Sequence, residues 1–166
     1  MLHRFSIRIE RPPADVFAFL GSKDTYSQHK DSPVLVLEKT TEGAVGIGTR
    51  YREVVQMAPF VRSEILSEVT RYEQYSVLEE RWSGGGMTGT LTYFFTAVGQ
   101  GTELRQHVEI GTHWLLRLFD PVLSRMYARA ARYRLECIKA ILETGRSPDI
   151  ARIKWWHLNR GRRSAP

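Results

Sequence analysis

The sequence predicts an α+β domain in which an antiparallel sheet curves around one long C-terminal helix. Residues 34–111 read as strands and hairpins with no helical period between them, which favours an antiparallel meander over βαβ units. Residues 114–144 have the helical pattern, with apolar residues recurring at alternating steps of three and four. These residues are Leu116, Phe119, Leu123, Met126, Ala130, Tyr133 and Cys137. A single apolar helix that follows such strands buries its face by lying across the sheet.

The N-terminal segment predicts one strand and one short helix before the meander. Phe5, Ile7 and Ile9 alternate with polar and charged residues, as in a half-buried strand. Pro12 and Pro13 end this strand, and the second proline suits the first turn of a helix whose apolar residues follow at 16, 17, 19 and 20. Residues 21–24 read as a break, and residues 25–30 as a second short helix or a loop.

Six further strands are predicted, at residues 34–37, 49–57, 61–72, 76–82, 87–98 and 102–110. The glycines at 84–86 and at 99 and 101 mark two of the turns between them. The long helix is expected to begin at Asp120–Pro121, because Asp is a favoured N-cap and Pro suits the next position. Residues 114–119 would then form a leading turn, and Gly145 would end the helix.

The charge distribution divides the chain into a body and a tail. The net charge of the 166 residues is +6, but residues 145–166 carry six basic side chains against Asp149, so +5 belongs to the tail. We therefore expect a domain at residues 1–144 and a basic, Trp-containing tail at residues 145–166. The nearly neutral body gives no electrostatic reason to expect nucleic acid as a partner.

Several functional classes are disfavoured by what the sequence lacks. No run approaches the ~20 apolar residues that cross a bilayer, and the start has no signal-peptide pattern. Cys137 is the single cysteine, which fits a reducing interior, so a cytoplasmic location is expected. The five histidines are not at metal-ligand spacing, and neither a P-loop nor a dinucleotide fingerprint is present, so we expect no metal and no cofactor.

The order of these elements resembles the START-like, or Bet v 1-like, helix-grip superfamily (SRPBCC), and most closely its bacterial polyketide cyclase/dehydratase-like branch. The matching segments, within residues 2–144, are residues 9–20, 48–53, 64–72, 99–104 and 135–143. The resemblance implies a seven-stranded antiparallel sheet around the terminal helix, with a deep apolar cavity between them. Members of the superfamily bind or transport lipids, cyclise polyketides or act as cofactor-free binding modules, so the fold alone does not select a reaction.

Alternation along the strands predicts which polar side chains face the interior. Tyr51 and Glu53 share a face opposite Arg50 and Arg52, so Glu53 is expected to point inward. A carboxylate there is a candidate for proton transfer or for binding a polar end of a ligand. The alternative interpretation is a glutamate at the cavity mouth that is held in a salt bridge.

Three more inward positions are predicted on the following strands. Trp82 is expected as core or cavity wall, and Tyr93 as a buried tyrosine whose hydroxyl needs a partner, either in the protein or on a ligand. Gln106 is the polar member of an otherwise aliphatic face, where it would orient a ligand oxygen or satisfy a neighbouring tyrosine.

Two further groups complete the predicted site. From the helix, Leu116, Phe119, Leu123 and Met126 are expected to wall the cavity. Tyr26 and His29 lie in the region that often closes the cavity mouth in this superfamily, which makes them gate candidates; a solvated loop is the alternative.

The tail has two interpretations as well. Residues 150–163 combine Trp155 and Trp156 with basic residues, as peripheral membrane segments do. The alternative is a short helix that docks its tryptophans on the body.

Three functions follow from these features. The leading one is binding of a hydrophobic or amphipathic small molecule, lipid- or polyketide-like, in the central cavity. The second is a cofactor-independent cyclase or dehydratase that uses Glu53 and a tyrosine for proton transfer. The third is a lipid or quinone chaperone that its basic tail recruits to a membrane. The sequence does not decide whether the protein is an enzyme.

Overall fold

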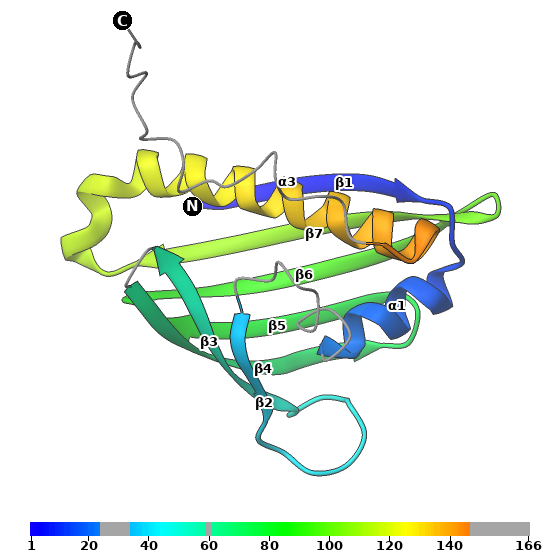
Figure 1. Cartoon of the computed structure of the whole chain (residues 1–166), viewed down its shortest axis with the longest axis horizontal. Coiled ribbons are helices and arrows are strands. Elements are labelled where there is room, and N and C mark those ends of the chain that lie inside the picture. The colour runs from blue at the N-terminus through cyan, green and yellow to red at the C-terminus, as the bar shows by residue number, and fades with distance from the viewer. Residues whose placement is uncertain (24–33, 59–60, 147–166) are drawn as a thin grey trace, which may run out of the picture.

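The computed structural model describes residues 1–23, 34–58 and 61–146, and it confirms the predicted architecture of a curved antiparallel sheet with one long helix along it (Figure 1). The elements are β1 (Leu2–Ile9), α1 (Pro13–Gly21), β2 (Val34–Lys39), β3 (Arg50–Ala58), β4 (Val61–Glu73), β5 (Val77–Gly84), β6 (Met87–Val98), β7 (Gly101–Thr112), the 3-10 helix η1 (Trp114–Phe119) and α3 (Asp120–Thr144). The segment 25–30, predicted as a second short helix or a loop, lies outside the described residues.

The seven strands form one sheet in the order β1-β7-β6-β5-β4-β3-β2, and every neighbouring pair is antiparallel. Strands β2 to β7 follow one another as a meander, as the sequence predicts. The first strand instead lies at the edge of the sheet beside the last strand, with Leu2 opposite Glu109 and Ile9 opposite Thr102.

The hairpin between β5 and β6 shows why the sequence has three glycines there. Gly84 ends β5, and only Gly85 and Gly86 remain for the turn before Met87. Both have positive φ angles, of 60° and 76°, which is the backbone of a two-residue type I′ turn. Glycine adopts this conformation without the steric penalty of a Cβ atom.

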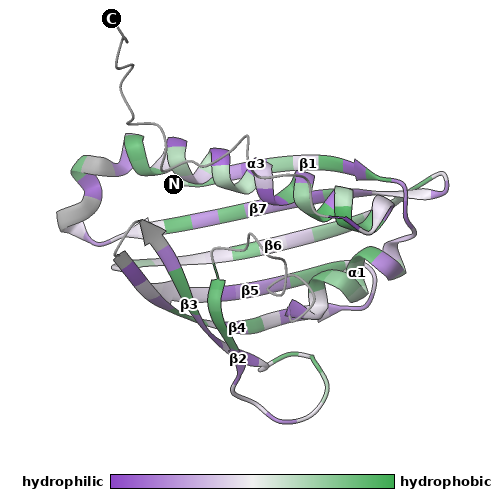
Figure 2. Ribbon diagram, viewed as in Figure 1, coloured by the Kyte–Doolittle hydropathy of each residue, from purple (hydrophilic) through white to green (hydrophobic). Residues whose placement is uncertain are grey.

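The core lies between the inner face of the sheet and the two helices. Each strand alternates between this face and solvent, and hydrophobic and hydrophilic residues accordingly alternate along β7 in Figure 2. On β7 the inner positions Leu104, Gln106, Val108 and Ile110 are buried, while Arg105 and Glu109 are exposed. The predicted register of this strand is therefore confirmed.

Helix α1 is fixed to the sheet by aromatic contacts. Its predicted apolar residues Val16, Phe17, Phe19 and Leu20 are all buried. The Phe17 ring meets Tyr72 and Phe95 edge-on, with centroid distances of 5.0 and 5.1 Å. These contacts hold the C-terminal end of α1 over the sheet, which places the residues that follow it on the inner face.

Helix α3 begins at Asp120 and ends at Thr144, and η1 forms the predicted leading turn. The prediction of its packing face, however, is only partly confirmed: Leu123 and Tyr133 are partly buried, while Met126 and Ala130 are exposed. Its buried residues are Ala131, Leu135, Cys137 and Ile138, and Cys137 is the one buried member among the predicted apolar residues whose side chains are described. Because apolar residues occupy two sides of this helix, hydrophobicity alone does not identify the side that meets the sheet.

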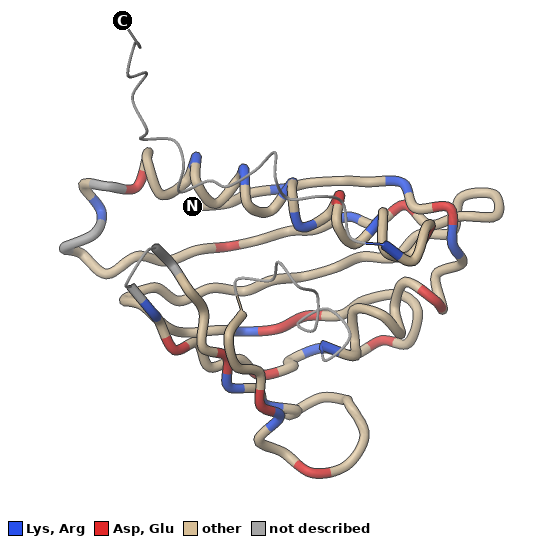
Figure 3. The backbone as a smooth tube through the Cα atoms, in the orientation of Figure 1, with Lys and Arg blue, Asp and Glu red and all other residues tan. Residues whose placement is uncertain are grey.

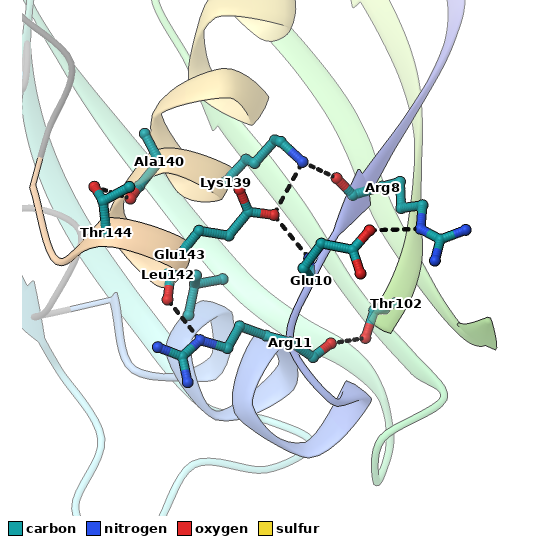
Figure 4. A network of polar contacts seen from close by, with 9 residues as sticks. All are labelled: Arg8, Glu10, Arg11, Thr102, Lys139, Ala140, Leu142, Glu143 and Thr144. Carbon is teal, nitrogen blue, oxygen red and sulfur yellow. Dashed lines mark hydrogen bonds and ion pairs between the residues drawn. The ribbon is translucent and has the colours of Figure 1, made fainter. Parts of the chain in front are cut away.

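A polar network joins the end of α3 to the end of β1 (Figure 4). A Glu143 carboxylate oxygen accepts hydrogen bonds from the Glu10 backbone N–H at 2.7 Å and from the Lys139 ammonium at 2.9 Å. The Arg11 guanidinium donates to the Leu142 carbonyl, and the Thr102 hydroxyl donates to the Arg11 carbonyl. These bonds hold the helix C-terminus against the start of α1.

In the part of the chain that the structure describes, no helix is long and apolar enough to span a membrane.

Candidate functional site

A lysine and two glutamates meet on the inner face of the sheet. Lys23 follows α1, and its Nζ lies 2.8 Å from Glu53 Oε1 on β3 and 2.7 Å from Glu80 Oε2 on β5. The same ammonium donates to the Ser67 hydroxyl at 3.0 Å and lies 4.6 Å from the centroid of the Tyr51 ring. We call these five residues the lysine–glutamate cluster.

The lysine–glutamate cluster is largely shielded from water. The side chains of Lys23, Glu53 and Glu80 are 13%, 17% and 9% exposed. Burial alone would lower the pKa of Lys23, but the charges of Glu80 and Glu53 outweigh it, so the pKa of Lys23 is raised above its ordinary value. Lys23 is therefore protonated near neutral pH. It neutralises the two carboxylates and is not available as a neutral amine nucleophile.

Tyr93 and Gln106 form a second polar group on the same face. They lie directly opposite each other on β6 and β7, with 3% and 0% of their surfaces exposed. The Tyr93 hydroxyl and both polar atoms of the Gln106 amide are buried without a hydrogen-bond partner among the described residues. We call this pair the tyrosine–glutamine pair.

The surroundings of Tyr93 determine its protonation state. Burial raises the pKa of Tyr93 to about 12, with smaller contributions from Tyr127, Glu80 and Glu53, while Arg134 on α3 opposes the shift. Tyr93 is thus a neutral phenol at physiological pH, able both to donate and to accept a hydrogen bond. Glu80 lies opposite Leu91, which is two residues before Tyr93 on β6, so the tyrosine–glutamine pair and the lysine–glutamate cluster are neighbours on the inner face.

Trp82 lies at the edge of this region and packs on a glycine. It faces Gly89 across the β5–β6 ladder and is partly buried. A Cβ atom at position 89 would lie 2.6 Å from the Trp82 ring, so only glycine leaves room for the indole there.

The structure therefore brings together the inward residues that alternation predicts. Tyr51, Glu53, Trp82, Tyr93 and Gln106 all lie on the inner face. The ion pair of Glu53 favours its interpretation as a salt-bridge partner, and its role in proton transfer stays a prediction.

The structure describes only some of the predicted cavity-wall and gate residues. Leu123 is partly buried, whereas Met126 is 47% exposed. The side chains of Leu116 and Phe119, and all of Tyr26 and His29, lie outside the described part of the chain, so their roles stay predictions.

Lys23, Ser67 and Glu80 are the site residues that the sequence did not reveal. Glu80 alternates with Leu78 and Trp82, which was a signal for an inward position. The signal was weak, because both faces of that strand mix apolar and charged residues. Lys23 carries no such signal, because it lies in an apparent break and meets its partners through tertiary contacts.

Metal sites and surface hollows are the other places where a protein binds ligands. Among residues 1–23, 34–58 and 61–146, no three His, Cys, Asp or Glu side chains are placed to hold a metal ion. Two hollows of about 570 and 300 Å³ share the lining residues Leu2, Arg81, Thr90 and Glu109. These side chains alternate away from the inner face, so the smaller hollow lies on the other side of the sheet from the tyrosine–glutamine pair. The larger hollow is lined by Trp82 and Ile110 as well, so it reaches the edge of the sheet where Trp82 packs on Gly89.

Comparison with known proteins agrees with this architecture. Residues 4–143 match the model of a family described as polyketide cyclase/dehydrase and lipid transport. No curated protein matches the sequence.

Solved structures of the same fold share little sequence with this chain. The protein TTHA0849 of Thermus thermophilus has a TM-score of 0.71 at 17% identity, over 89% of this chain and 100% of its own. Norcoclaurine synthase of Thalictrum flavum has a TM-score of 0.67 at 10% identity, over 89% and 95%. The di-domain ARO/CYC protein StfQ of the steffimycin biosynthetic pathway has a TM-score of 0.66 at 12% identity, over 85% of this chain and 44% of its own.

Proposed function

The chain belongs to the polyketide cyclase/dehydrase and lipid transport family, and from this premise we propose that it binds one hydrophobic or amphipathic small molecule between its sheet and its C-terminal helix. In this proposal residues 1–144 form the binding domain and residues 145–166 a separate basic tail. The family description covers both ligand binding and cyclase chemistry, so the choice between them rests on the inner face of the sheet.

The tyrosine–glutamine pair carries the proposal. A buried polar group without a partner costs about 1–3 kcal/mol, and this pair presents three such atoms among the described residues. The side chains next to them along the same two strands are Leu91, Phe95, Leu104 and Val108, which are all buried and apolar. A ligand with an apolar body and an oxygen-bearing end would satisfy both requirements.

The chemistry of the pair defines that polar end. The Gln106 amide donates through Nε2 and accepts through Oε1, and the neutral Tyr93 phenol adds one more donor. A carbonyl or hydroxyl group, or the two together, matches this set better than a free charge does.

Replacement of Gln106 by Leu tests the proposal. Because the amide has no protein partner among the described residues, Gln106→Leu is expected to leave the free energy of unfolding of the ligand-free protein unchanged or to raise it by about 1 kcal/mol. The same substitution is expected to weaken ligand binding roughly tenfold through the lost hydrogen bonds. Urea denaturation measures the first effect. Titration with a panel of fatty acids, sterols, quinones and aromatic polyketides measures the second, and native mass spectrometry of gently purified protein selects the ligands to titrate.

Thr102 provides the matched control on the same face of β7. Its hydroxyl is buried but donates a hydrogen bond of 2.7 Å to the Arg11 carbonyl, so Thr102→Val is expected to lower the stability by about 1–2 kcal/mol without changing ligand affinity. A large loss of stability in Gln106→Leu, together with no uptake from the whole panel, would contradict the proposal.

A cofactor-independent cyclase or dehydratase is the second candidate, favoured by the position of Glu53 on the inner face, where it shares Lys23 with Glu80. In such an enzyme Glu53 would move a proton while the inner face orients the substrate. The substitution Glu53→Gln separates the candidates: an enzyme is expected to lose turnover and keep its binding, whereas a carrier changes in affinity alone. Product analysis by mass spectrometry, beside a binding titration, distinguishes these outcomes.

A further inference from the structure

The outward side of η1 and of the first half of α3 exposes an unusual number of large apolar residues. Trp114, Leu118, Val122 and Met126 are 69%, 89%, 56% and 47% exposed, and they recur at every fourth position. These four are among ten large hydrophobic residues that are exposed in the described chain. Such a concentration on two consecutive elements marks an interaction surface more often than isolated exposed leucines do.

Arginines flank these apolar residues. Arg117, Arg125, Arg129 and Arg132 are all exposed, and Figure 3 shows the basic residues along α3 as a row of blue segments. Two acidic residues of α3 lie near them. Asp120 is partly buried and accepts a hydrogen bond of 2.8 Å from the Thr112 hydroxyl, and Glu136 is exposed about one turn after Arg132. We call the four apolar residues together with Arg117, Arg125 and Arg129 the outer helix face. The Arg132 guanidinium instead lies 5.9 Å from the centroid of the Phe5 ring on β1.

The helical geometry places this face away from the core. Val122, Arg125, Met126 and Arg129 follow the i, i+3, i+4, i+7 pattern of one helix side. The buried Ala131 comes nine residues after Val122, which is two and a half turns and therefore the opposite side. In the first half of α3 the outer helix face is thus not the side that packs on the sheet, whereas Cys137, further along that side, is buried.

We propose that the outer helix face docks on the surface of an anionic lipid bilayer. A helix side that combines exposed aliphatic and tryptophan side chains with arginines inserts its apolar residues below the headgroups while the guanidinium groups bind lipid phosphates and carboxylates. Two partners from the chain itself do not match the charge of this surface. The tail has a net charge of +5, and a second copy that docked through the same face would present the same arginines. The charge of the surface therefore calls for an anionic partner.

The first test is co-sedimentation of the full chain with vesicles. The wild-type protein is expected to bind vesicles of phosphatidylcholine mixed with phosphatidylserine, to bind pure phosphatidylcholine much more weakly, and to be released by high salt. Arg125→Glu combined with Arg129→Glu is expected to weaken binding to the anionic vesicles about tenfold or more. Arg62→Glu combined with Arg105→Glu makes the same charge change at exposed positions of β4 and β7 and is expected to bind nearly as well as the wild type.

The second test addresses the apolar residues. Leu118→Ser combined with Val122→Ser is expected to weaken binding about tenfold as well, and to abolish the blue shift of tryptophan emission on vesicle addition. Leu35→Ser combined with Leu66→Ser is the control, since these residues are 48% and 51% exposed on β2 and β4. All the substituted side chains are exposed, so unchanged thermal unfolding verifies the fold of each variant.

Three results of the vesicle experiments would overturn the proposal, and a fourth comes from a polypeptide control. They are wild-type protein that stays in solution with anionic vesicles, helix variants that sediment as the wild type does, and equal loss of binding in the control variants. Binding to an acidic polypeptide such as polyglutamate without binding to vesicles would also overturn it, in favour of a protein partner. None of these readouts depends on the ligand of the inner face, so the failure of one proposal leaves the other intact.

Discussion

At the scale of single residues, Lys23 determines the electrostatics of the inner face. It is the cation that Glu53 and Glu80 share, and it lies within hydrogen-bond distance of both. Two carboxylates so close together repel each other and lose hydration on burial, so their presence on this face depends on the ammonium.

Substitution of Lys23 by Met is therefore expected to be strongly destabilising. It leaves two shielded carboxylates unpaired, and we expect the free energy of unfolding at neutral pH to fall by roughly 3 kcal/mol. Further substitution of Glu53→Gln and Glu80→Gln in the same chain is expected to recover part of this loss, because it removes the unpaired charges. Chemical denaturation measures both effects.

The control is an exposed ion pair on the same sheet. Arg50 and Glu68 are paired at 2.9 Å with side chains that are 64% and 43% exposed, so Arg50→Met is expected to cost less than about 1 kcal/mol. Equal effects of Lys23→Met and Arg50→Met would show that the lysine–glutamate cluster is no more than another surface pair.

The residues of the site differ in how well the sequence predicts them. Tyr51, Glu53, Tyr93 and Gln106 could be placed on the inner face because a strand alternates its sides with a period of two. Lys23 could not be placed, since the packing of α1 brings it to partners on β3 and β5 that are far away in the sequence. Partner choice at that distance is a property of the assembled fold.

At the scale of elements, the junction of α3 with β1 depends on Glu143. Its carboxylate accepts a backbone hydrogen bond from Glu10 and a side-chain bond from Lys139, and these bonds lower the pKa of Glu143 below its ordinary value of 4.5. The pKa of Glu143 in the unfolded chain is the higher of the two, so the ionised form stabilises the fold.

This shift predicts a pH-dependent effect of Glu143→Gln. The contribution of the carboxylate is fully present above the unfolded pKa, and it is lost as the pH falls through the lower pKa of the folded state. The free energy of unfolding of the wild type is expected to exceed that of the variant by about 1–2 kcal/mol at neutral pH, and the difference is expected to shrink as the pH falls below the ordinary pKa of 4.5. Urea denaturation at a series of pH values measures it.

A glutamate in an exposed pair is the comparison for this experiment. Glu73 pairs with Arg71, and both side chains are 48% exposed, so Glu73→Gln is expected to change the stability little at any pH. A difference between wild type and Glu143→Gln that does not change with pH would contradict the proposed role of the carboxylate.

The strands and helices also differ in how well the sequence predicts them. The seven strands followed from alternation and turn glycines, and the predicted start of α3 at Asp120–Pro121 is confirmed. The predicted N-cap is wrong, because Asp120 is itself helical and its carboxylate accepts a hydrogen bond from the Thr112 hydroxyl. The buried side of α3 did not follow from the pattern, because a helix with apolar residues on two sides can meet the sheet through either. Ala131, a small residue that contributes little to a hydrophobic pattern, lies on the side that packs.

At the scale of the whole molecule, polar groups gather on two surfaces with different chemistry. The inner face carries the tyrosine–glutamine pair and the lysine–glutamate cluster, which suit the oxygen-bearing end of an apolar ligand. The outer helix face carries arginines among exposed apolar residues, which suit an anionic bilayer. In the proposed arrangement one helix separates the ligand from the membrane surface.

The pairing of β1 with β7 has a consequence for how the protein is made. Leu2 pairs with Glu109, so the first strand is synthesised long before its partner strand. At about 5–20 residues per second, the intervening residues take on the order of 5–20 s to be synthesised. Contacts between such distant positions also slow folding itself, because a large loop must close first. The nascent chain therefore completes its sheet only after residue 112 has emerged, and until then β1 has no partner strand.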